Sequence, residues 1–333
     1  MRRDDLIGKV MTRRGIWGPL RAWGISPVTL TVLIIVAAAP LLISDQYIVH
    51  LMVVSLLFGA QTICFDFTTG FISVVNFGFS AFVGLGGYVS AITMSRMGLN
   101  PWLGMALGAF AAGLLGFLTG VLTLRLRGIY AAIMTWFVGL ALMALASVLV
   151  DVTRGNWGLN VPQLFHGNKM AYYYVLLGVT VLIWIVLRRV TTSSYGLAFR
   201  AIGQDMEAAM ASGINPTTCR VFNFTLACFF AGLLGGFYAH FVGVLTPDIM
   251  STSHTVEVLA LSYIGGRGTL WGGALASVIF IPLFEYLKPL MELRLIIYGA
   301  LLTLVMILFP GGMVSPMAWV AAKYRARRAR LTQ

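Results

Sequence analysis

Apolar blocks of about twenty residues follow one another from Ser26 to Pro310, and short polar gaps separate them. A helix needs about 20 apolar residues to cross a hydrocarbon core roughly 30 Å thick, so each full-length block can span a membrane once. The block at 255–266 is too short to span alone. The pattern predicts an all-α, polytopic transmembrane helical bundle of about ten membrane segments, including broken or short ones. The predicted segments are 28–44, 46–65, 71–95, 101–124, 129–150, 171–187, 221–247, 255–266, 269–287 and 295–309.

Composition suits a protein whose solvent is lipid. Hydrophobic residues make up 59% of the 333 residues and charged residues only 10%, whereas soluble domains carry about 25% charged residues. The three cysteines, Cys64, Cys219 and Cys228, have neither an even count nor metal-type spacing, so we expect no disulfide framework and no metal site. The net charge of +12 comes from basic residues scattered at block edges, which favours anionic lipid over nucleic acid as their partner.

Lysine and arginine collect in every second gap between the apolar blocks. Because such residues in short loops stay on the cytoplasmic side, the asymmetry predicts that both termini are cytoplasmic. The chain then divides into a basic cytoplasmic tail at 1–25, a membrane domain at 26–313 and a second basic cytoplasmic tail at 314–333. The longest cytoplasmic connection within the membrane domain is 188–220.

Glycines cluster at 77–88, 107–120, 231–238 and 264–273. Small residues let helices pack closely, and for the middle two clusters this role and a role in transport stay open as alternatives. The glycine density of the first and last clusters would weaken a plain spanning helix, and broken helices in transporters commonly hold the substrate. We therefore place a translocation path near 70–88 and 254–273. Its candidate residues are Asn76, Gly78, Phe79, Gly84, Gly86, Gly87, Glu257, Gly265, Gly266, Gly268 and Thr269.

Few ionisable residues fall within the apolar blocks, namely His50, Asp66, His240, Glu257 and Glu285. They do not form the chain of carboxylates that would indicate proton or sodium coupling. We expect Asp66 at a helix end and Glu285 near an interface. For His240 and Glu257, a packing role is favoured over contact with a substrate.

The 188–220 loop contains a short helix with its own start and stop signals. Asp205 can cap its amino end, Met206 to Ala211 are good helix formers, and Gly213 with the following Asn-Pro pair ends it. Its Glu-Ala-Ala core offers a charge and two small residues that could fit a groove on another protein. A helix lying on lipid is the alternative, but the acidic residues and the lack of bulky apolar ones favour docking.

No phosphate loop of the G-x-x-x-x-G-K-[ST] type occurs in the chain, so we expect no nucleotide or other cofactor on it. Paired carboxylates, metal clusters and nucleophile–base arrangements are not discernible either, so an enzymatic role is not expected. Energy for transport would come from a partner that moves the 200–214 helix as a rigid body and so switches access.

Four motifs carry a resemblance to a known family. They are NFGFSAFVGLGGY (76–88), LRLRGIYAAIMT (124–135), FRAIGQDMEAAMASGIN (199–215), and GGRGTLWGG (265–273) followed by RLIIYGALLTLVMILFPGG (294–312). From about 45 to 313, the chain resembles the permease subunits of bacterial ABC importers for branched-chain amino acids, in particular the larger of the two permeases. The resemblance implies a multi-pass permease of the bacterial cytoplasmic (inner) membrane.

The same resemblance implies partners and residue roles. The partners are a second permease subunit, two cytoplasmic ATP-binding subunits that carry ATP-Mg, and a periplasmic or extracellular substrate-binding protein, here met by loops 151–170 and 246–254. The third motif is similar to the family's coupling loop, which docks on the ATPase subunit. The residues that inherit this role are Arg200, Asp205, Glu207, Ala208, Ala209 and Gly213.

Departures from the family pattern leave the substrate open. Phe79 stands where a histidine is common, Gly272 and Gly273 stand where Gly-Pro is frequent, and the loop at 154–159 lacks the usual Thr-Gly-Gly opening. The substrate could be a branched-chain or related amino acid, or urea or a short amide. A secondary carrier that works without partners is the alternative from a different class.

Overall fold

The computed structural model describes residues 36–41, 45–123, 126, 128–165, 167–287, 293–308 and 311–313. The chain divides into two compact units, Met1–Asp45 and Gln46–Gln333. In the first unit, the 3-10 turn η1 (Ala39–Leu41) belongs to the described part. Both predicted tails, 1–25 and 314–333, lie outside the described residues, as does most of the predicted segment 28–44.

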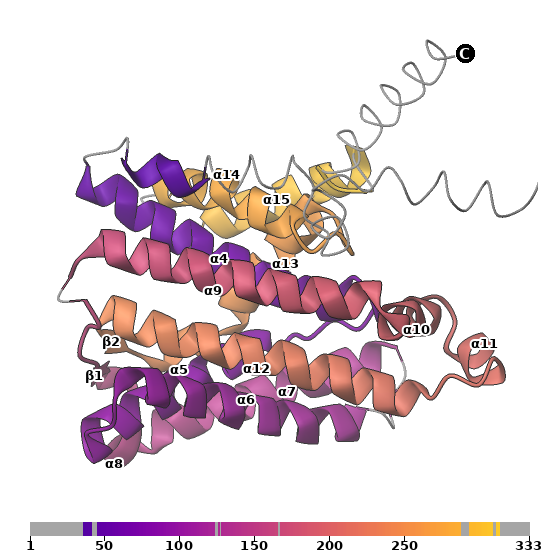
Figure 1. Ribbon diagram of the computed structural model, residues 1–333, viewed down its shortest axis with the longest axis horizontal. Coiled ribbons are helices and arrows are strands. Elements are labelled where there is room, and N and C mark those ends of the chain that lie inside the picture. The colour runs from indigo at the N-terminus through magenta and orange to yellow at the C-terminus, as the bar shows by residue number, and fades with distance from the viewer. Residues whose placement is uncertain are drawn as a thin grey trace, which may run out of the picture. The chain divides into compact units, whose positions relative to one another are not determined.

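The second unit is a bundle of helices (Figure 1). Its longer helices are α4 (Gln46–Thr69), α5 (Phe79–Met97), α6 (Pro101–Thr123), α7 (Ile129–Val148), α9 (Lys169–Thr192), α12 (Pro216–Val242), α13 (Thr252–Gly265), α14 (Gly272–Tyr286) and α15 (Leu293–Leu308). Among the described residues, α4, α6, α7, α9 and α12 are each long and apolar enough to cross a membrane. The predicted fold class, a polytopic helical bundle, is confirmed.

Short elements join these helices at the two ends of the bundle. They are α8 (Val150–Thr153), η2 (Gly155–Trp157), β1 (Leu159–Asn160), α10 (Ser194–Gln204), α11 (Met206–Ala211), β2 (Val244–Leu245) and η3 (Pro247–Met250). Strands β1 and β2 pair antiparallel, with Leu159 opposite Leu245. In Figure 1, α10 and α11 lie at one end, and α8, β1 and β2 lie at the other.

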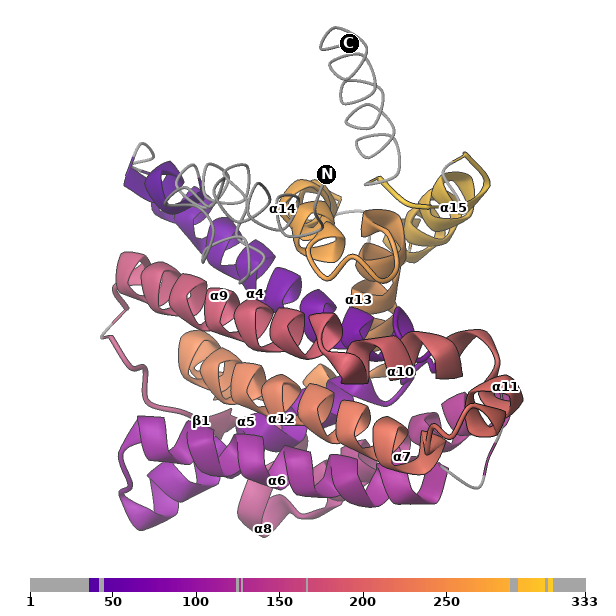
Figure 2. The ribbon, with the colours of Figure 1, turned by 45° about the vertical axis from the view of Figure 1, so that its right-hand side comes forward.

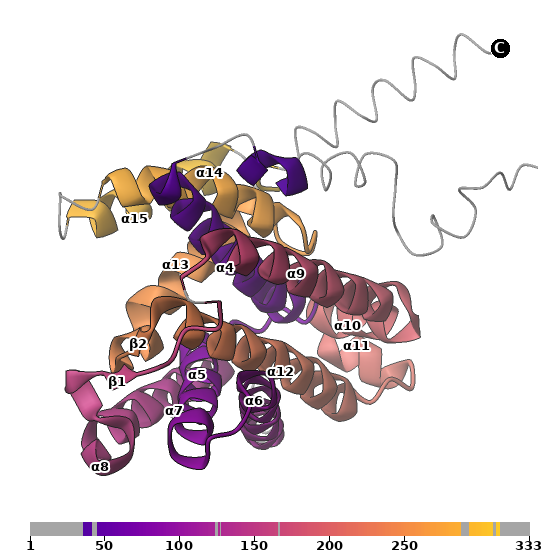
Figure 3. The ribbon, with the colours of Figure 1, turned by 60° about the vertical axis from the view of Figure 1, so that its left-hand side comes forward.

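Helix α12 lies between two groups of helices. Figures 2 and 3 show α5, α6 and α7 on one side of α12 and α4 and α9 on the other. Helices α13 and α14 pack against α4. Helix α15 packs against α13, so α13 and α14 complete the bundle around α4.

The gaps that the charge pattern assigns to the cytoplasm meet at the end marked by α10 and α11. There the Arg267 guanidinium donates to the Ser73 hydroxyl at 3.4 Å, and the Arg200 guanidinium lies 5.3 Å from the centre of the Phe71 ring. The gaps assigned to the opposite side meet at the other end, where the Lys169 ammonium donates to the Gln46 carbonyl oxygen at 3.1 Å. This separation is what the predicted orientation requires.

Two predicted helix boundaries are wrong because a polar turn before α5 and a polar cap on α12, and not the apolar blocks, mark where the helices begin. Helix α5 begins at Phe79 and not near 71, and the Asn76 side chain accepts a hydrogen bond from the Gly78 N–H at 3.1 Å just before it. Helix α12 begins at Pro216 and not near 221, because Asn215 caps the Thr217 N–H at 3.0 Å and proline suits a first helical turn.

Glycines hold α5, α6 and α12 against one another. A Cβ atom added to Gly86 would meet the backbone of Gly232 on α12, and one added to Gly108 on α6 would meet the Gly86 carbonyl oxygen. Helix α5 runs without a break through Gly84, Gly86 and Gly87, so the expectation that this cluster interrupts a helix is wrong. No side chain fits between these backbones, so glycine allows the helices to pack closely. The close packing offsets the low helix propensity of the glycines.

Gly235→Ala should destabilise the protein, because a Cβ atom there would collide with the Val83 carbonyl oxygen on α5. Overpacking of this kind costs about 1–3 kcal/mol. Gly178→Ala on α9 is the matched control, since a Cβ there meets nothing within 4 Å and alanine favours the helix. Thermal unfolding of the purified variants would test this, and equal midpoints for the two would contradict it.

Candidate functional site

The short helix predicted in the 188–220 loop is present as α11. Its amino end is capped by Asp205, whose carboxylate accepts the Glu207 N–H at 2.9 Å and the Ala208 N–H at 3.1 Å. Its carboxyl end closes at Gly213, which has a φ of +82° and whose N–H donates to the Met210 carbonyl oxygen at 2.9 Å. Both ends are satisfied by local groups, so α11 is a rigid unit.

The faces of α11 differ in exposure. Ala209 is buried, whereas Glu207 and Ala208 are exposed. Arg200, on the preceding helix α10, is also exposed and lies against Phe71. The predicted coupling residues therefore lie on one compact α10–α11 unit, with a carboxylate and a small side chain facing solvent.

The α10–α11 unit rests on the loop that joins α4 to α5. A Cβ atom on Gly203 of α10 would come within 2.6 Å of the Phe71 carbonyl oxygen. A hollow of about 300 Å³ between the loop and the unit is lined by Ser73, Glu207 and Arg220, among other residues. Arg220, near the start of α12, also donates to the Met206 sulfur at 3.9 Å. A displacement of the α10–α11 unit would thus act on this loop through α10 and on α12 through α11.

The loop that joins α13 to α14 is held by the end of α4. Asp66, which is 2% exposed, accepts the Gly268 N–H at 2.8 Å and the Leu270 N–H at 2.9 Å with its two carboxylate oxygens. Leu270 has a φ of +63°, a conformation that is uncommon for a residue with a side chain. The prediction that Asp66 lies at a helix end is confirmed, but its partner in the 266–271 turn was not foreseen.

The last glycine cluster interrupts the helical structure between α13 and α14, as predicted. Gly266 and Gly268 have φ values of +111° and +73°, and Gly265 packs against the backbone of Gly272. Thr269 donates to the Gly266 carbonyl oxygen at 2.8 Å and accepts the Gly272 N–H at 3.1 Å. These residues shape a tight turn at the α10–α11 end of the bundle.

The first group of predicted path residues lies in packed helix contacts. Asn76 is buried and accepts the Gly78 N–H in the turn before α5, and Gly78 lies against the Thr135 carbonyl oxygen of α7. Phe79 is buried and meets Phe65 edge to face, with ring centres 5.4 Å apart. The role of this group in a translocation path stays a prediction.

The glycines further along α5 also lie at contacts. A Cβ on Gly84 would collide with the Met250 side chain of η3, and one on Gly87 would come within 3.0 Å of the Gly235 carbonyl oxygen. Gly84, Gly86 and Gly87 are therefore placed where helices approach each other. The structure does not bring them together with Glu257, which lines a separate cavity.

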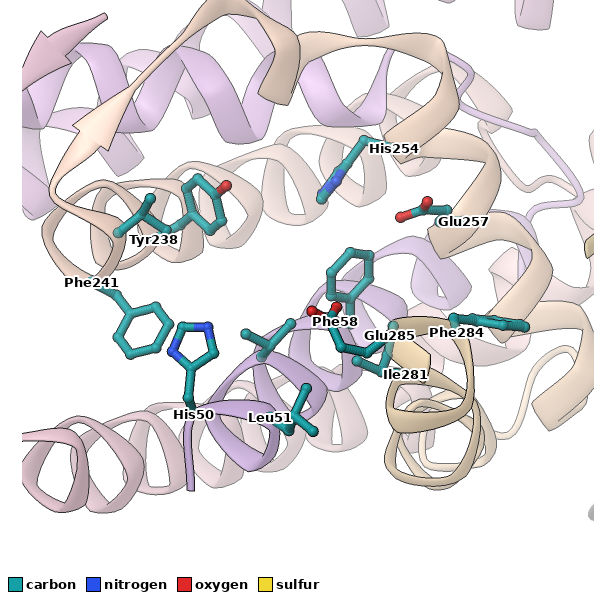
Figure 4. Close-up of a pocket in the computed structure, with 12 residues that line it drawn as sticks. His50, Leu51, Phe58, Tyr238, Phe241, His254, Glu257, Ile281, Phe284 and Glu285 are labelled. Atoms are coloured by element: carbon teal, nitrogen blue, oxygen red, sulfur yellow. The ribbon is translucent and has the colours of Figure 1, made fainter. Parts of the chain in front are cut away.

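This cavity has a volume of about 280 Å³ and lies between α4, α12, α13 and α14 (Figure 4). Ligand pockets typically measure roughly 300–1,000 Å³, so it suits a small solute. Its lining comprises His50, Leu51, Val54, Phe58, Tyr238, Phe241, Val242, His254, Glu257, Ile281, Phe284 and Glu285. The sequence singled out His50, Glu257 and Glu285 separately, but no spacing in it indicated that they meet.

His240 is fully buried and has partners on both ring nitrogens. Its Nδ1 lies 3.0 Å from the Pro162 carbonyl oxygen and its Nε2 lies 3.0 Å from the Ser90 hydroxyl. Because a carbonyl oxygen only accepts, Nδ1 donates and Nε2 accepts from Ser90. The preference for a packing role at His240 agrees with this geometry.

The five described helices that are long and apolar enough to cross a membrane define a multi-pass membrane protein. Residues 47–309 match the family described as "Branched-chain amino acid transport system / permease component", and the chain belongs to this family. The resemblance stated from the four motifs is therefore confirmed.

Relatives in this family differ in the solute that their names state. The chain is 26% identical to the high-affinity branched-chain amino acid transport system permease protein LivM of Salmonella typhimurium, over 90% of this chain and 77% of the relative. It is 27% identical to the LivM protein of Escherichia coli over 74% of this chain and 64% of the relative. The chain is 27% identical to the fructose import permease protein FrcC of Rhizobium meliloti, over 56% of this chain and 56% of the relative. No solved structure matches the chain.

Proposed function

We propose that this chain is a permease subunit of an ATP-driven importer in a bacterial inner membrane, and that it carries branched-chain or related amino acids. Membership of the permease family supports a transport role. The LivM match extends over 90% of the chain, whereas the match to the fructose permease covers 56% of it. This difference in coverage favours an amino acid over a sugar as the solute.

The observation that carries the proposal is the set of contacts that hold the α10–α11 unit against the rest of the bundle. Helix α11 is capped by Asp205 and contacts Arg220 of α12 through Met206, and the adjoining helix α10 rests on the α4–α5 loop at Gly203. A movement of α11 can therefore be transmitted into the bundle. Two partner ATPases, which bind ATP-Mg, would drive that movement by closing on each other. Movement of whole helices between two packed arrangements would then switch the path between outward and inward access.

The loop at Ser73 extends this connection to α13 and α14. Arg267 donates to Ser73, and Asp66 holds the adjacent turn through Gly268 and Leu270. A shift of α11 would therefore reach the carboxyl-terminal hairpin as well as α5. The second permease subunit would complete the path from the other side.

The opposite end of the bundle would receive solute from a substrate-binding protein. Trp157 in η2 is 91% exposed there, next to the β1–β2 pair. Large aromatic side chains that are exposed at the surface are typical anchors of protein interfaces. This end includes the loops at 151–170 and 246–254.

Uptake by the reconstituted importer tests the proposal. Proteoliposomes that contain this chain, the second permease and the two ATPases should take up leucine, isoleucine or valine when ATP and the binding protein are present. Omitting the ATPases should abolish uptake. Uptake of fructose or urea in place of amino acids would overturn the proposed substrate class. Uptake by this chain alone without ATP would overturn the proposed ATP-driven mechanism.

A further inference from the structure

We propose that the cavity between α4, α12, α13 and α14 receives the imported solute and that Glu257 and Glu285 bind its ammonium group. The inference rests on the proposed function and narrows the solute to molecules that carry a cationic amine. The two carboxylates belong to different helices, Glu257 to α13 and Glu285 to α14. Figure 4 shows both carboxylates directed into the space that the four helices enclose.

The cavity has an apolar wall and a polar, acidic wall. Leu51, Val54 and Phe58 of α4 and Ile281 and Phe284 of α14 form the apolar part. This wall suits an aliphatic side chain, because burying it removes apolar surface from water. A sugar, with hydroxyl groups on most of its faces, would leave polar groups unpaired against such a wall.

The charge of the cavity favours a cation. Among the described residues that line it, the two glutamates are the acidic ones, and neither lysine nor arginine is present. Membrane helices surround the space, so its low dielectric constant strengthens attraction between a carboxylate and an ammonium group. A neutral solute such as urea gains nothing from this field.

The two histidines of the cavity are held in place by neighbouring groups. The His50 ring stacks on the Phe241 ring, with centres 5.1 Å apart and planes at 21°. His254 Nε2 lies 3.0 Å from Gln61 Oε1. Gln61 itself is 0% exposed, and its amide nitrogen has no hydrogen-bond partner in the structure. The Tyr238 hydroxyl, which also lines the cavity, offers a donor of the kind that the carboxylate of an amino acid requires.

Cysteine labelling in the assembled importer tests the charge of the cavity directly. Val54→Cys places a thiol in the lining, while the three native cysteines are buried. A methanethiosulfonate reagent with an ammonium group should label it at least about tenfold faster than the reagent of similar size with a sulfonate group. Val244→Cys, at an exposed position of strand β2, gives the reference ratio for a thiol outside the cavity.

Neutral substitutions should remove this preference. In the Val54→Cys background, E257Q together with E285Q should bring the ratio of labelling rates close to the reference. Asp151→Asn, which removes an exposed carboxylate outside the cavity, should leave the ratio unchanged. A ratio at the reference value before substitution, or one that the double substitution leaves unchanged, would overturn the inference.

Protection from labelling identifies the ligand class. Isopentylamine should slow the labelling of Val54→Cys, whereas isopentyl alcohol, which has the same carbon skeleton without the charge, should not. Equal protection by both would show an apolar site without amine selectivity and would overturn the inference. Amino acid uptake without amine protection refutes the cavity assignment alone, whereas amine protection without ATP-driven uptake refutes the proposed function and leaves the amine site standing.

Discussion

Glu207→Arg is expected to abolish ATP-driven uptake, with a loss of about 100-fold or more. Glu207 is exposed on α11, and Asp205 caps the helix, so the substitution reverses a surface charge without removing the cap. Like charges placed against each other in an interface cost several kcal/mol. The measurement is leucine uptake into proteoliposomes, together with recovery of the ATPase subunits on the tagged permease.

Glu207→Gln is the matched control, because it keeps the size of the side chain and removes only the charge. It should retain a measurable part of the uptake, and the complex should still copurify. Full uptake by Glu207→Arg would mean that α11 does not dock on the ATPase. The docking assignment would then have to move to another cytoplasmic surface.

Asp66→Ala is expected to lower the free energy of unfolding by about 3 kcal/mol and to reduce uptake. The substitution leaves the N–H groups of Gly268 and Leu270 without their acceptor in a buried setting. The turn then loses the contact that holds its left-handed residues, so it should open more often. Thermal unfolding of the purified protein and hydrogen exchange across residues 266–271 would measure the two effects.

Asp66→Asn provides the graded comparison, since it keeps one carbonyl oxygen as an acceptor and replaces the other with a donor. The free energy of unfolding of Asp66→Asn should lie between that of the wild-type protein and that of Asp66→Ala. If Asp66→Ala neither lowered the unfolding midpoint nor sped up hydrogen exchange in the turn, the hydrogen bonds from the turn to Asp66 of α4 would not stabilise the α13–α14 connection.

Local signals in the sequence were sufficient to predict the short helix α11. Asp205, the helix-forming run Met206–Ala211 and Gly213 predicted its limits, and the structure has α11 with those limits. Caps and left-handed glycines act on hydrogen bonds within a few residues, so their effect does not depend on the rest of the fold. Among the described residues, the spans α4, α6, α7, α9 and α12 followed from apolar length in the same way.

The glycine clusters could not be interpreted from local sequence alone. Gly86 and Gly268 both belong to glycine-rich segments, yet Gly86 lies inside the continuous helix α5 and Gly268 lies in a turn with a φ of +73°. The difference depends on neighbours that are distant in sequence. Gly86 has the backbone of Gly232 against it, and Gly268 has the carboxylate of Asp66.

The sequence by itself determined that this chain crosses a membrane repeatedly, which gaps meet at one end of the bundle, and where the capped helix α11 lies, because apolar length, charge and capping act over short stretches. Only the tertiary structure decided that Asp66 reaches the 266–271 turn and that Glu257 and Glu285 line one cavity. These contacts join segments far apart in sequence, and they arise from how the helices pack.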